Sequence, residues 1–199
     1  MERKKIGSRV KKGEYGYLVA QRIKVIIRTV FMFALSLGIF GIGLWLNGGD
    51  KKSIWTIAAV VGLLPASRSA VSMIMFLKAR GCSDEAHQRL QKQEEGLTYL
   101  YDLFFTSYQK NYQVSHMVVK DSIICGFSED ATCDEKACAR HIESMLKQSG
   151  YKNITVKIDT NLQKYCESLD NLKSLEGIKN EDAEKKLQDI LSCLLSITL

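Results

Sequence analysis

Apolar positions are distributed unevenly along the chain, and the two longest apolar stretches both fall within the first 80 residues. One runs from Thr29 to Leu46 and the other from Ile54 to about Leu77. A helix rises about 1.5 Å per residue, so each stretch is long enough, or nearly so, to cross a hydrocarbon layer about 30 Å thick. Residues 47–53 form so short a connection that the helices must be antiparallel. The pattern therefore predicts a transmembrane hairpin with spans at about 29–46 and 54–77.

Basic residues are concentrated on one side of the predicted spans. Residues 1–28 hold nine basic and two acidic side chains, and Lys78 and Arg80 follow the second span. The connecting loop holds two lysines, partly offset by one aspartate. Because basic residues beside membrane spans stay on the cytoplasmic side, we expect a multi-pass protein of the cell membrane. Both termini would be cytoplasmic and the loop would lie outside.

Tryptophans flank the predicted loop on both sides. Trp45 closes the first span and Trp55 opens the second. Indole rings favour the membrane interface, so both are expected at the outer interface, with chance placement as the alternative. The first span exceeds the about 7–15 apolar residues of a signal peptide and lacks a small-residue cleavage pattern before the loop. We therefore expect it to be retained.

Small residues recur at helical spacing in both spans. They are Ala34, Gly38 and Gly41 in the first span and Ala58, Gly62, Ala66 and Ala70 in the second. Such stripes let backbones approach closely in lipid, where the hydrophobic effect does not drive helix association. Two interpretations stay open: the stripes pack on each other within one hairpin, or one of them recruits another subunit.

Arg68 is a charged residue within the second span. It lies fourteen residues after Ile54, about 21 Å along the helix. At that depth an arginine can extend its guanidinium to the cytoplasmic interface. A buried contact between subunits and an ion or substrate path are the alternatives. Pro65, the single proline of the chain, removes a helical hydrogen bond and is expected to kink this helix.

The charge balance changes at Gly81. Residues 1–80 carry fourteen basic and three acidic side chains, whereas residues 81–199 carry fourteen basic and nineteen acidic ones. The basic residues 1–28 are expected to lie against anionic lipid. The mildly acidic C-terminal part is not expected to bind nucleic acid, although it is long enough for one ordinary core. We predict a basic juxtamembrane segment (1–28), the hairpin (29–80) and a cytosolic domain (81–199).

Apolar periodicity predicts the order α-β-β-α-β-α-α for residues 81–199. The expected elements are a helix from Ser83 to about Ser107, strands near 114–118 and 123–127 joined by a tight turn, a helix from Thr132 to Ser149, a strand at 153–159, a helix after Thr160 and a last helix from Asn180. Capping boxes of the form S/T-x-x-E/Q begin at Thr132 and Thr160. A small mixed sheet covered by helices, an α/β (α+β) fold, is the natural arrangement.

Candidate catalytic and metal-binding residues are few. Among six cysteines, Cys133 and Cys138 with His141 form the nearest approach to a metal-ligand set, but zinc sites usually contain tighter pairs. Core and surface thiols are the alternative, and we expect no cofactor. The histidines, His87, His116 and His141, lie in no recognisable catalytic arrangement.

A nuclease-like site is a further alternative. Several metal-dependent nuclease cores share this element order, and the acids available at predicted strand ends and turns are Asp121, Glu129, Asp130 and Asp159. No lysine accompanies them at the required strand spacing. Neither G-x-x-x-x-G-K-[ST] nor G-x-G-x-x-G occurs in the chain. Enzymatic activity is therefore uncertain, and the pattern argues against it more than for it.

The sequence favours a membrane anchor or scaffold that presents a small cytosolic domain for protein–protein interaction or self-association at the inner membrane face. One alternative is a membrane-tethered enzyme or small-ligand sensor, with its pocket near the 120–135 turn and Asp159. Another is a subunit of an oligomeric channel or transporter, with Arg68 at the assembly interface. A pocket with convergent acids, cysteine or histidine would favour the sensor, and an apolar patch on the domain would favour the scaffold.

Overall fold

The computed structural model describes residues 10–46, 48, 54–108, 110–175 and 181–199. Within these, residues 18–80 form one compact unit, and residues 10–17 together with 81–199 form a second one. Apart from Gly48, the predicted loop 47–53 lies outside the described residues, and so does Asn180.

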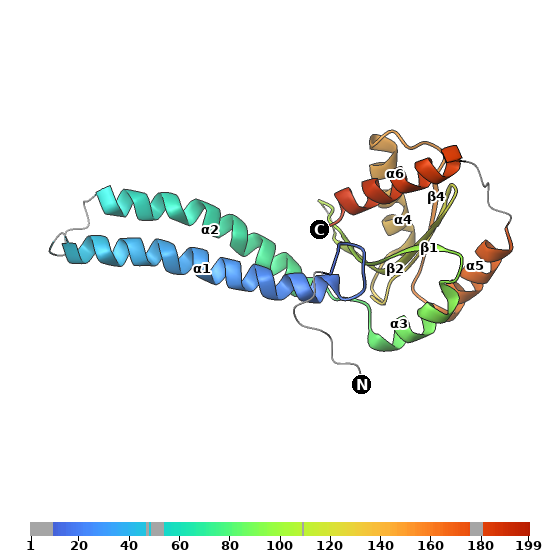
Figure 1. Cartoon of the computed structure of the whole chain (residues 1–199), viewed down its shortest axis with the longest axis horizontal. Coiled ribbons are helices and arrows are strands. Elements are labelled where there is room, and N and C mark those ends of the chain that lie inside the picture. The colour runs from blue at the N-terminus through green and yellow to red at the C-terminus, as the bar shows by residue number, and fades with distance from the viewer. Residues whose placement is uncertain (1–9, 47, 49–53, 109, 176–180) are drawn as a thin grey trace. The chain divides into compact units, whose positions relative to one another are not determined.

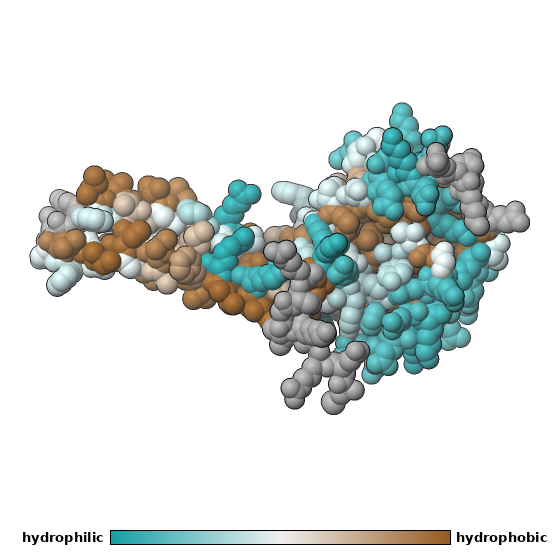
Figure 2. Space-filling model, viewed as in Figure 1, coloured by the Kyte–Doolittle hydropathy of each residue, from teal (hydrophilic) through white to brown (hydrophobic). Residues whose placement is uncertain are grey.

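The first unit is a pair of long helices, α1 (Tyr17–Leu46) and α2 (Ile54–Lys78), which lie side by side in Figure 1. Both are long and apolar enough to cross a membrane. Only 17% of the residues in the most apolar window of α1, and 11% in that of α2, are buried. Apolar side chains therefore cover much of the visible surface of both helices (Figure 2), whereas the core helix of a soluble domain buries its apolar face.

The two helices meet along a seam of small and polar side chains. The buried hydroxyls of Thr29 and Ser69 lie 2.8 Å apart, and Thr29 also donates to the Ser69 carbonyl at 3.1 Å. Ala66 is fully buried, and a Cβ atom added to Gly62 would lie 2.9 Å from Ser36 Oγ. Small side chains thus bring the two backbones close together, and the hydroxyls satisfy each other where water is excluded.

The seam ends near the C-terminus of α2 with an arginine. Arg22 of α1 donates to the Phe76 carbonyl at 3.2 Å and to the Ala79 carbonyl at 2.6 Å. The last carbonyls of a helix have no partner within it, so this contact satisfies them and joins the two helices. The helix α2 continues through Pro65.

We expect Ala66→Leu to weaken the pairing of the helices by about 1–3 kcal/mol, because the added carbon atoms have no space at the seam. Ala58→Leu is the matched control, since Ala58 lies exposed on the same helix. Stability is measured by titrating the full chain in mild detergent with a denaturing one. Equal stability of the two variants would contradict the close packing of α1 and α2 at Ala66.

The second unit is built on a four-stranded mixed sheet in the order β1-β2-β3-β4. Its elements are α3 (Asp84–Leu90), the 3-10 helix η1 (Gln91–Gln93), β1 (Thr98–Phe105), β2 (Tyr112–Lys120), β3 (Ile123–Phe127), α4 (Glu135–Gln148), β4 (Thr155–Asp159), α5 (Leu162–Ser174) and α6 (Glu181–Ile197). Strands β1 to β3 pair antiparallel, and β4 is parallel to β3. Helices α3 and α5 cover one face of the sheet, and α4 and α6 cover the other (Figure 1).

The predicted mixed sheet with covering helices is confirmed, and so are the two strands with a tight turn at Asp121. The prediction of one helix over residues 83–107 is wrong. That region contains α3, which ends at Leu90, and the strand β1, which begins at Thr98. Gly96, with φ +77°, turns the chain between them. The sheet therefore has one strand more than the sequence indicated.

Side-chain caps begin three of the helices. Ser83 caps α3, as predicted. The starts predicted at Thr132 and Thr160 are wrong by one or two residues, because the side chains of Asp134 and Asn161 accept the first-turn amides of α4 and α5. Aspartate and asparagine are stronger N-caps than threonine.

The alternation of side chains inverts in the middle of β1. Asp102 has a left-handed backbone with φ 56°, so Leu100 and Leu103 both pack on the core under α4 and α6. Tyr101 packs on the core under α3 and α5. A left-handed backbone costs about 1–2 kcal/mol, although aspartate tolerates it better than most residues. Here the buried Asp102 carboxylate accepts the Cys82 amide at 2.7 Å.

Strand β2 inverts at the matching position. Val114 and Met117 both belong to the core under α4 and α6, whereas Val118 belongs to the other core. His116 lies opposite Tyr101 and reaches α5. Regular alternation would place Val114, His116 and Val118 on one face of the sheet, and β2 departs from it at Val114. The cause is the inversion that Asp102 imposes on the paired strand.

The outer edge of β1 is covered at two points by residues far apart in the sequence. The Gly13 carbonyl accepts the Tyr101 amide at 2.7 Å, and the Leu199 amide donates to the Phe104 carbonyl at 2.9 Å. An uncovered edge strand can pair with another chain. Residues 10–17 thus belong structurally to this unit, and α1 begins at Tyr17, the last of them.

We expect Gly13→Ala to loosen this edge more than Gly16→Ala. Both glycines have left-handed φ angles, 89° and 82°, so each alanine adds backbone strain of about 1 kcal/mol. At Gly13 the new Cβ would also lie 2.8 Å from Leu100, whereas nothing lies within 4 Å at Gly16. Amide hydrogen exchange at Tyr101 measures the difference. Equal exchange in the two variants would contradict the contact.

Candidate functional site

A pocket of about 500 Å³ opens in the α/β unit where residues 11–15 meet the end of α3 and strand β1. Its wall includes Lys11, Lys12, Glu14, Tyr15, His87, Gln91, Glu94, Tyr99 and Tyr101. A volume of this order can accommodate a small ligand. The sequence prediction placed a pocket near the 120–135 turn and Asp159, so this pocket lies elsewhere.

Aromatic rings form much of the pocket. Tyr15 stacks on His87, with ring centroids 3.8 Å apart and an angle of 5° between the planes. Tyr101 meets Tyr15 and Tyr99 nearly at right angles, each at a centroid distance of 5.8 Å. Tyr101 is 2% exposed and Tyr99 is 42% exposed, so Tyr101 lies at the floor of the pocket and Tyr99 at its rim.

A polar network lies under the rings. The Tyr101 hydroxyl donates to Glu94 Oε1, and His116 Nε2 lies 3.5 Å from the same oxygen. His116 Nδ1 lies 2.8 Å from the Tyr165 hydroxyl. His116 and Tyr165 are fully buried, whereas Glu94 is 9% exposed and borders the pocket. The network therefore links the core under α5 to the pocket floor.

The protonation states in this network follow from burial. Burial would raise the pKa of Glu94, but the facing His116 ring and the Tyr101 hydroxyl outweigh it, so this pKa is lowered from 4.5. Burial also lowers the pKa of His116 from 6.5, although Glu94 opposes the shift. At neutral pH the carboxylate is ionised and the imidazole is neutral.

One tautomer of His116 fits all of its neighbours. With the proton on Nε2, the ring points an N–H at the Glu94 carboxylate, and Nδ1 accepts the proton of Tyr165. The 3.5 Å separation is too long for a strong hydrogen bond, so the contact with Glu94 is mainly electrostatic. Because His116 is fully buried, it holds the carboxylate in place and does not reach the pocket itself.

The acids predicted for a nuclease-like site do not all meet, because Asp121 lies at the opposite end of β3 from the other three. Asp121 precedes β3, whereas Glu129 and Asp130 follow it, and Asp159 ends β4 beside Lys157 at 3.2 Å. The described residues contain no group of three or more His, Cys, Asp and Glu side chains that could hold a metal ion. The Glu129 carboxylate has a structural role instead: it accepts a hydrogen bond of 2.9 Å from the backbone amide of Ser83, the N-cap of α3.

Of the predicted metal candidates, Cys133 and Cys138 contact each other, but they form no group of three or more possible ligands with His141 or another described residue. Cys138 is fully buried in the core under α4 and α6, and the thiol of Cys133 contacts it. Hydrogen bonding from Cys138, with help from Ser128, lowers the pKa of Cys133 to about 7. The ring of His141 packs on Tyr112 at a centroid distance of 5.6 Å. Cys133 is thus the thiol best prepared to react with an alkylating reagent.

The small-residue stripes lie on different sides of the hairpin. Gly62 and Ala66 line the seam between α1 and α2, and Ala70 is half-buried, whereas Ala58 is exposed. The stripe of α1 is directed outward: its members Ala34, Gly38 and Gly41 are all exposed. The interpretation that this α1 stripe packs on α2 is therefore not realised, and α1 uses Thr29 and Ser36 at the seam instead.

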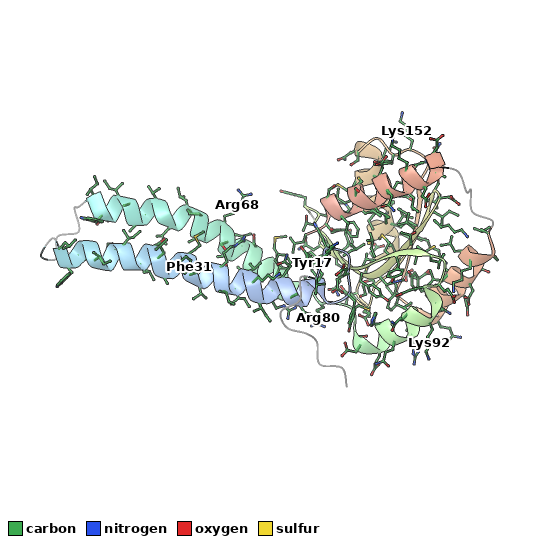
Figure 3. All side chains as sticks on the ribbon, in the orientation of Figure 1. Tyr17, Phe31, Arg68, Arg80, Lys92 and Lys152 are labelled. Atoms are coloured by element: carbon green, nitrogen blue, oxygen red, sulfur yellow. The ribbon has the colours of Figure 1, made fainter. Side chains whose placement is uncertain are left out.

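Of the other hairpin residues singled out by the sequence, Arg68 and Trp45 lie outside the contact between the helices, whereas Trp55 contacts α1 at Gly43. Arg68 is exposed, and Figure 3 shows its side chain on the side of α2 that faces away from α1. Trp45 is 83% exposed and Trp55 is 41% exposed. A Cβ atom on Gly43 would lie 2.3 Å from the Trp55 Cβ, so the helices are also in close contact near the loop.

Sequence reasoning missed Glu94, Tyr99 and Tyr101 as site residues because it assigned them to one long helix. The signal that could have found them is the aromatic alternation Tyr99-x-Tyr101 after Gly96, which favours a strand after a turn. Comparison of the chain with protein-family models, curated proteins and solved structures finds no match. The site therefore has to be interpreted from its own geometry.

The buried network predicts a loss of stability in acid. The pKa of His116 in the folded chain lies below 6.5. The stability that the neutral imidazole contributes is therefore complete above pH 6.5. As the pH falls below 6.5, the unfolded chain takes up the proton first, and stability decreases by at most about 1.4 kcal/mol per pH unit. The lowered pKa of Glu94 adds a second loss below 4.5.

We expect His116→Gln to remove the first of these losses and to reduce the second, because His116 is itself a main cause of the lowered pKa of Glu94. The measurement is urea unfolding of the full chain in detergent between pH 4 and 8, followed by hydrogen exchange in β2. A wild-type chain as stable at pH 5 as at pH 7 would contradict the assignment of a neutral His116.

Proposed function

We propose that this chain is a two-span membrane protein that holds a small binding domain at the cytosolic face. In this proposal α1 and α2 cross the bilayer as a hairpin, and residues 10–17 and 81–199 form the cytosolic part. The observation that carries it is the exposure of these apolar helices: only 17% of the residues in the most apolar window of α1, and 11% in that of α2, are buried. The predicted contact of the basic segment 1–28 with anionic lipid belongs to the same proposal.

The α/β unit differs from the helices in its surface. Its apolar side chains are gathered into two cores, one on each face of the sheet. Among its described residues, only three large apolar side chains are exposed: Tyr99, Tyr108 and Leu175. The visible face of this unit is largely hydrophilic (Figure 2). These features suit a domain that stays in water.

The scaffold function expected from the sequence would be supported by a broad apolar patch on the domain. Three exposed large apolar residues give it little support, whereas the pocket favours a second function, that of a small-ligand sensor. Residues 11–15 line the pocket, and α1 begins at Tyr17. A ligand in the pocket would therefore contact the segment that leads directly into the first span.

Labelling of cysteines tests the topology. All six cysteines follow residue 81, and none lies in the hairpin, so a cysteine introduced into the loop can be distinguished from them. We expect a membrane-impermeant maleimide to label Ser53→Cys in intact cells. Cys133, half-buried and with a pKa of about 7, should be labelled only after permeabilisation.

The wild-type chain is the matched control, because it has no cysteine between residues 18 and 80. Labelling of Cys133 in intact cells, or of Ser53→Cys only after permeabilisation, would overturn the proposed topology. Extraction of the intact chain from membranes by salt or carbonate without detergent would overturn the anchor.

A further inference from the structure

Glu94 is a buried acid that forms no ion pair with a lysine or arginine among the residues the structure describes. It is 9% exposed, and two histidines act on it electrostatically: His116, which is neutral, and His87 of the pocket wall. Buried charges in proteins are usually paired, because taking a lone charge out of water is energetically costly. A cation from outside the chain would supply the missing partner.

The lysines of the pocket do not supply it. The Lys12 ammonium donates to the Thr198 carbonyl at 2.8 Å, and burial lowers the pKa of this lysine. Lys11 contacts Glu14 through its backbone amide at 2.9 Å. Glu94 at the floor of the pocket is therefore not paired with Lys11 or Lys12 at its wall.

The walls beside Glu94 are aromatic. Tyr15 is half-buried and Tyr99 is largely exposed, and both stand nearly perpendicular to Tyr101 at the floor. The negative charge of Glu94 raises the pKa of Tyr99, so its field extends to the rim of the pocket. Aromatic faces around a carboxylate attract organic cations through their ring quadrupoles and through the charge.

We propose that this pocket binds an organic ammonium group, with the cation between Tyr15 and Tyr99 and above the Glu94 carboxylate. The inference rests on the ligand-sensing part of the proposed function and not on the membrane topology, because all the residues involved lie in the α/β unit. The same chemistry occurs in free amines and in the choline and ethanolamine headgroups of lipids.

Binding is measured on the full chain in a nonionic maltoside detergent, which carries no ammonium group. The probes are choline and ethanolamine, titrated at constant ionic strength and followed by saturation-transfer NMR. We expect saturable binding that Glu94→Gln weakens at least about tenfold, because the charge is lost. Tyr99→Leu should weaken it about threefold through loss of one aromatic wall; as Tyr99 is 42% exposed, this variant keeps the core intact.

The matched control is Glu95→Gln, which removes an exposed acid next in sequence to Glu94 and should leave binding unchanged. Nanodiscs separate the two sources: competition by phosphatidylethanolamine or phosphatidylcholine, but not by phosphatidylglycerol, assigns the site to a headgroup, and lack of competition assigns it to a free amine. No saturable binding of either probe, or equal binding by Glu94→Gln and Glu95→Gln, would overturn the inference. Either result would leave the cysteine-labelling test of topology untouched.

Discussion

The left-handed backbone of Asp102 is the constraint on which the α/β unit depends. It sits inside a strand, where almost any other residue would be extended, and is held there by the Cys82 amide. Its effect is to turn Tyr101 and His116 toward α5 while the residues on either side keep a continuous core under α4 and α6. A regularly alternating pair of strands would not place these groups together.

His116, Tyr165 and Glu94 lie together on the side of the sheet that α5 covers, so the free-energy cost of burying them depends on how they pair. His116 and Tyr165 are buried without charge, and each finds a partner in the other. Glu94 keeps its charge because Tyr101 and His116 together favour the ionised form. The cost of an ion at low exposure is thereby offset in part by hydrogen bonds and dipoles, as is usual for buried acids. What remains is a negative floor under an aromatic pocket.

The accuracy of the sequence prediction varies with the range of the interactions involved. Strands β2 and β3 were predictable from local alternation and a two-residue turn, and the cap at Ser83 from its position before a helix. Strand β1 was not, because Ala86, Leu90, Leu97, Tyr101 and Phe104 also fit a helical spacing. Residues 98–105 form a strand because they pair with β2 and because Gly13 and Leu199 cover the outer edge. These partners are distant in the chain, so a local sequence pattern does not reveal them.

By itself the sequence determined the two long apolar helices and the concentration of positive charge around them, since length, hydropathy and charge need no tertiary contact to act. It also determined that residues 81–199 would form a small mixed sheet with helices. Only the tertiary structure decided which small residues meet at the seam and where Asp102 inverts the strands. The tertiary structure also brought residues 11–15 next to Glu94. All these contacts require close packing between segments that are distant in the chain, which no local sequence pattern specifies.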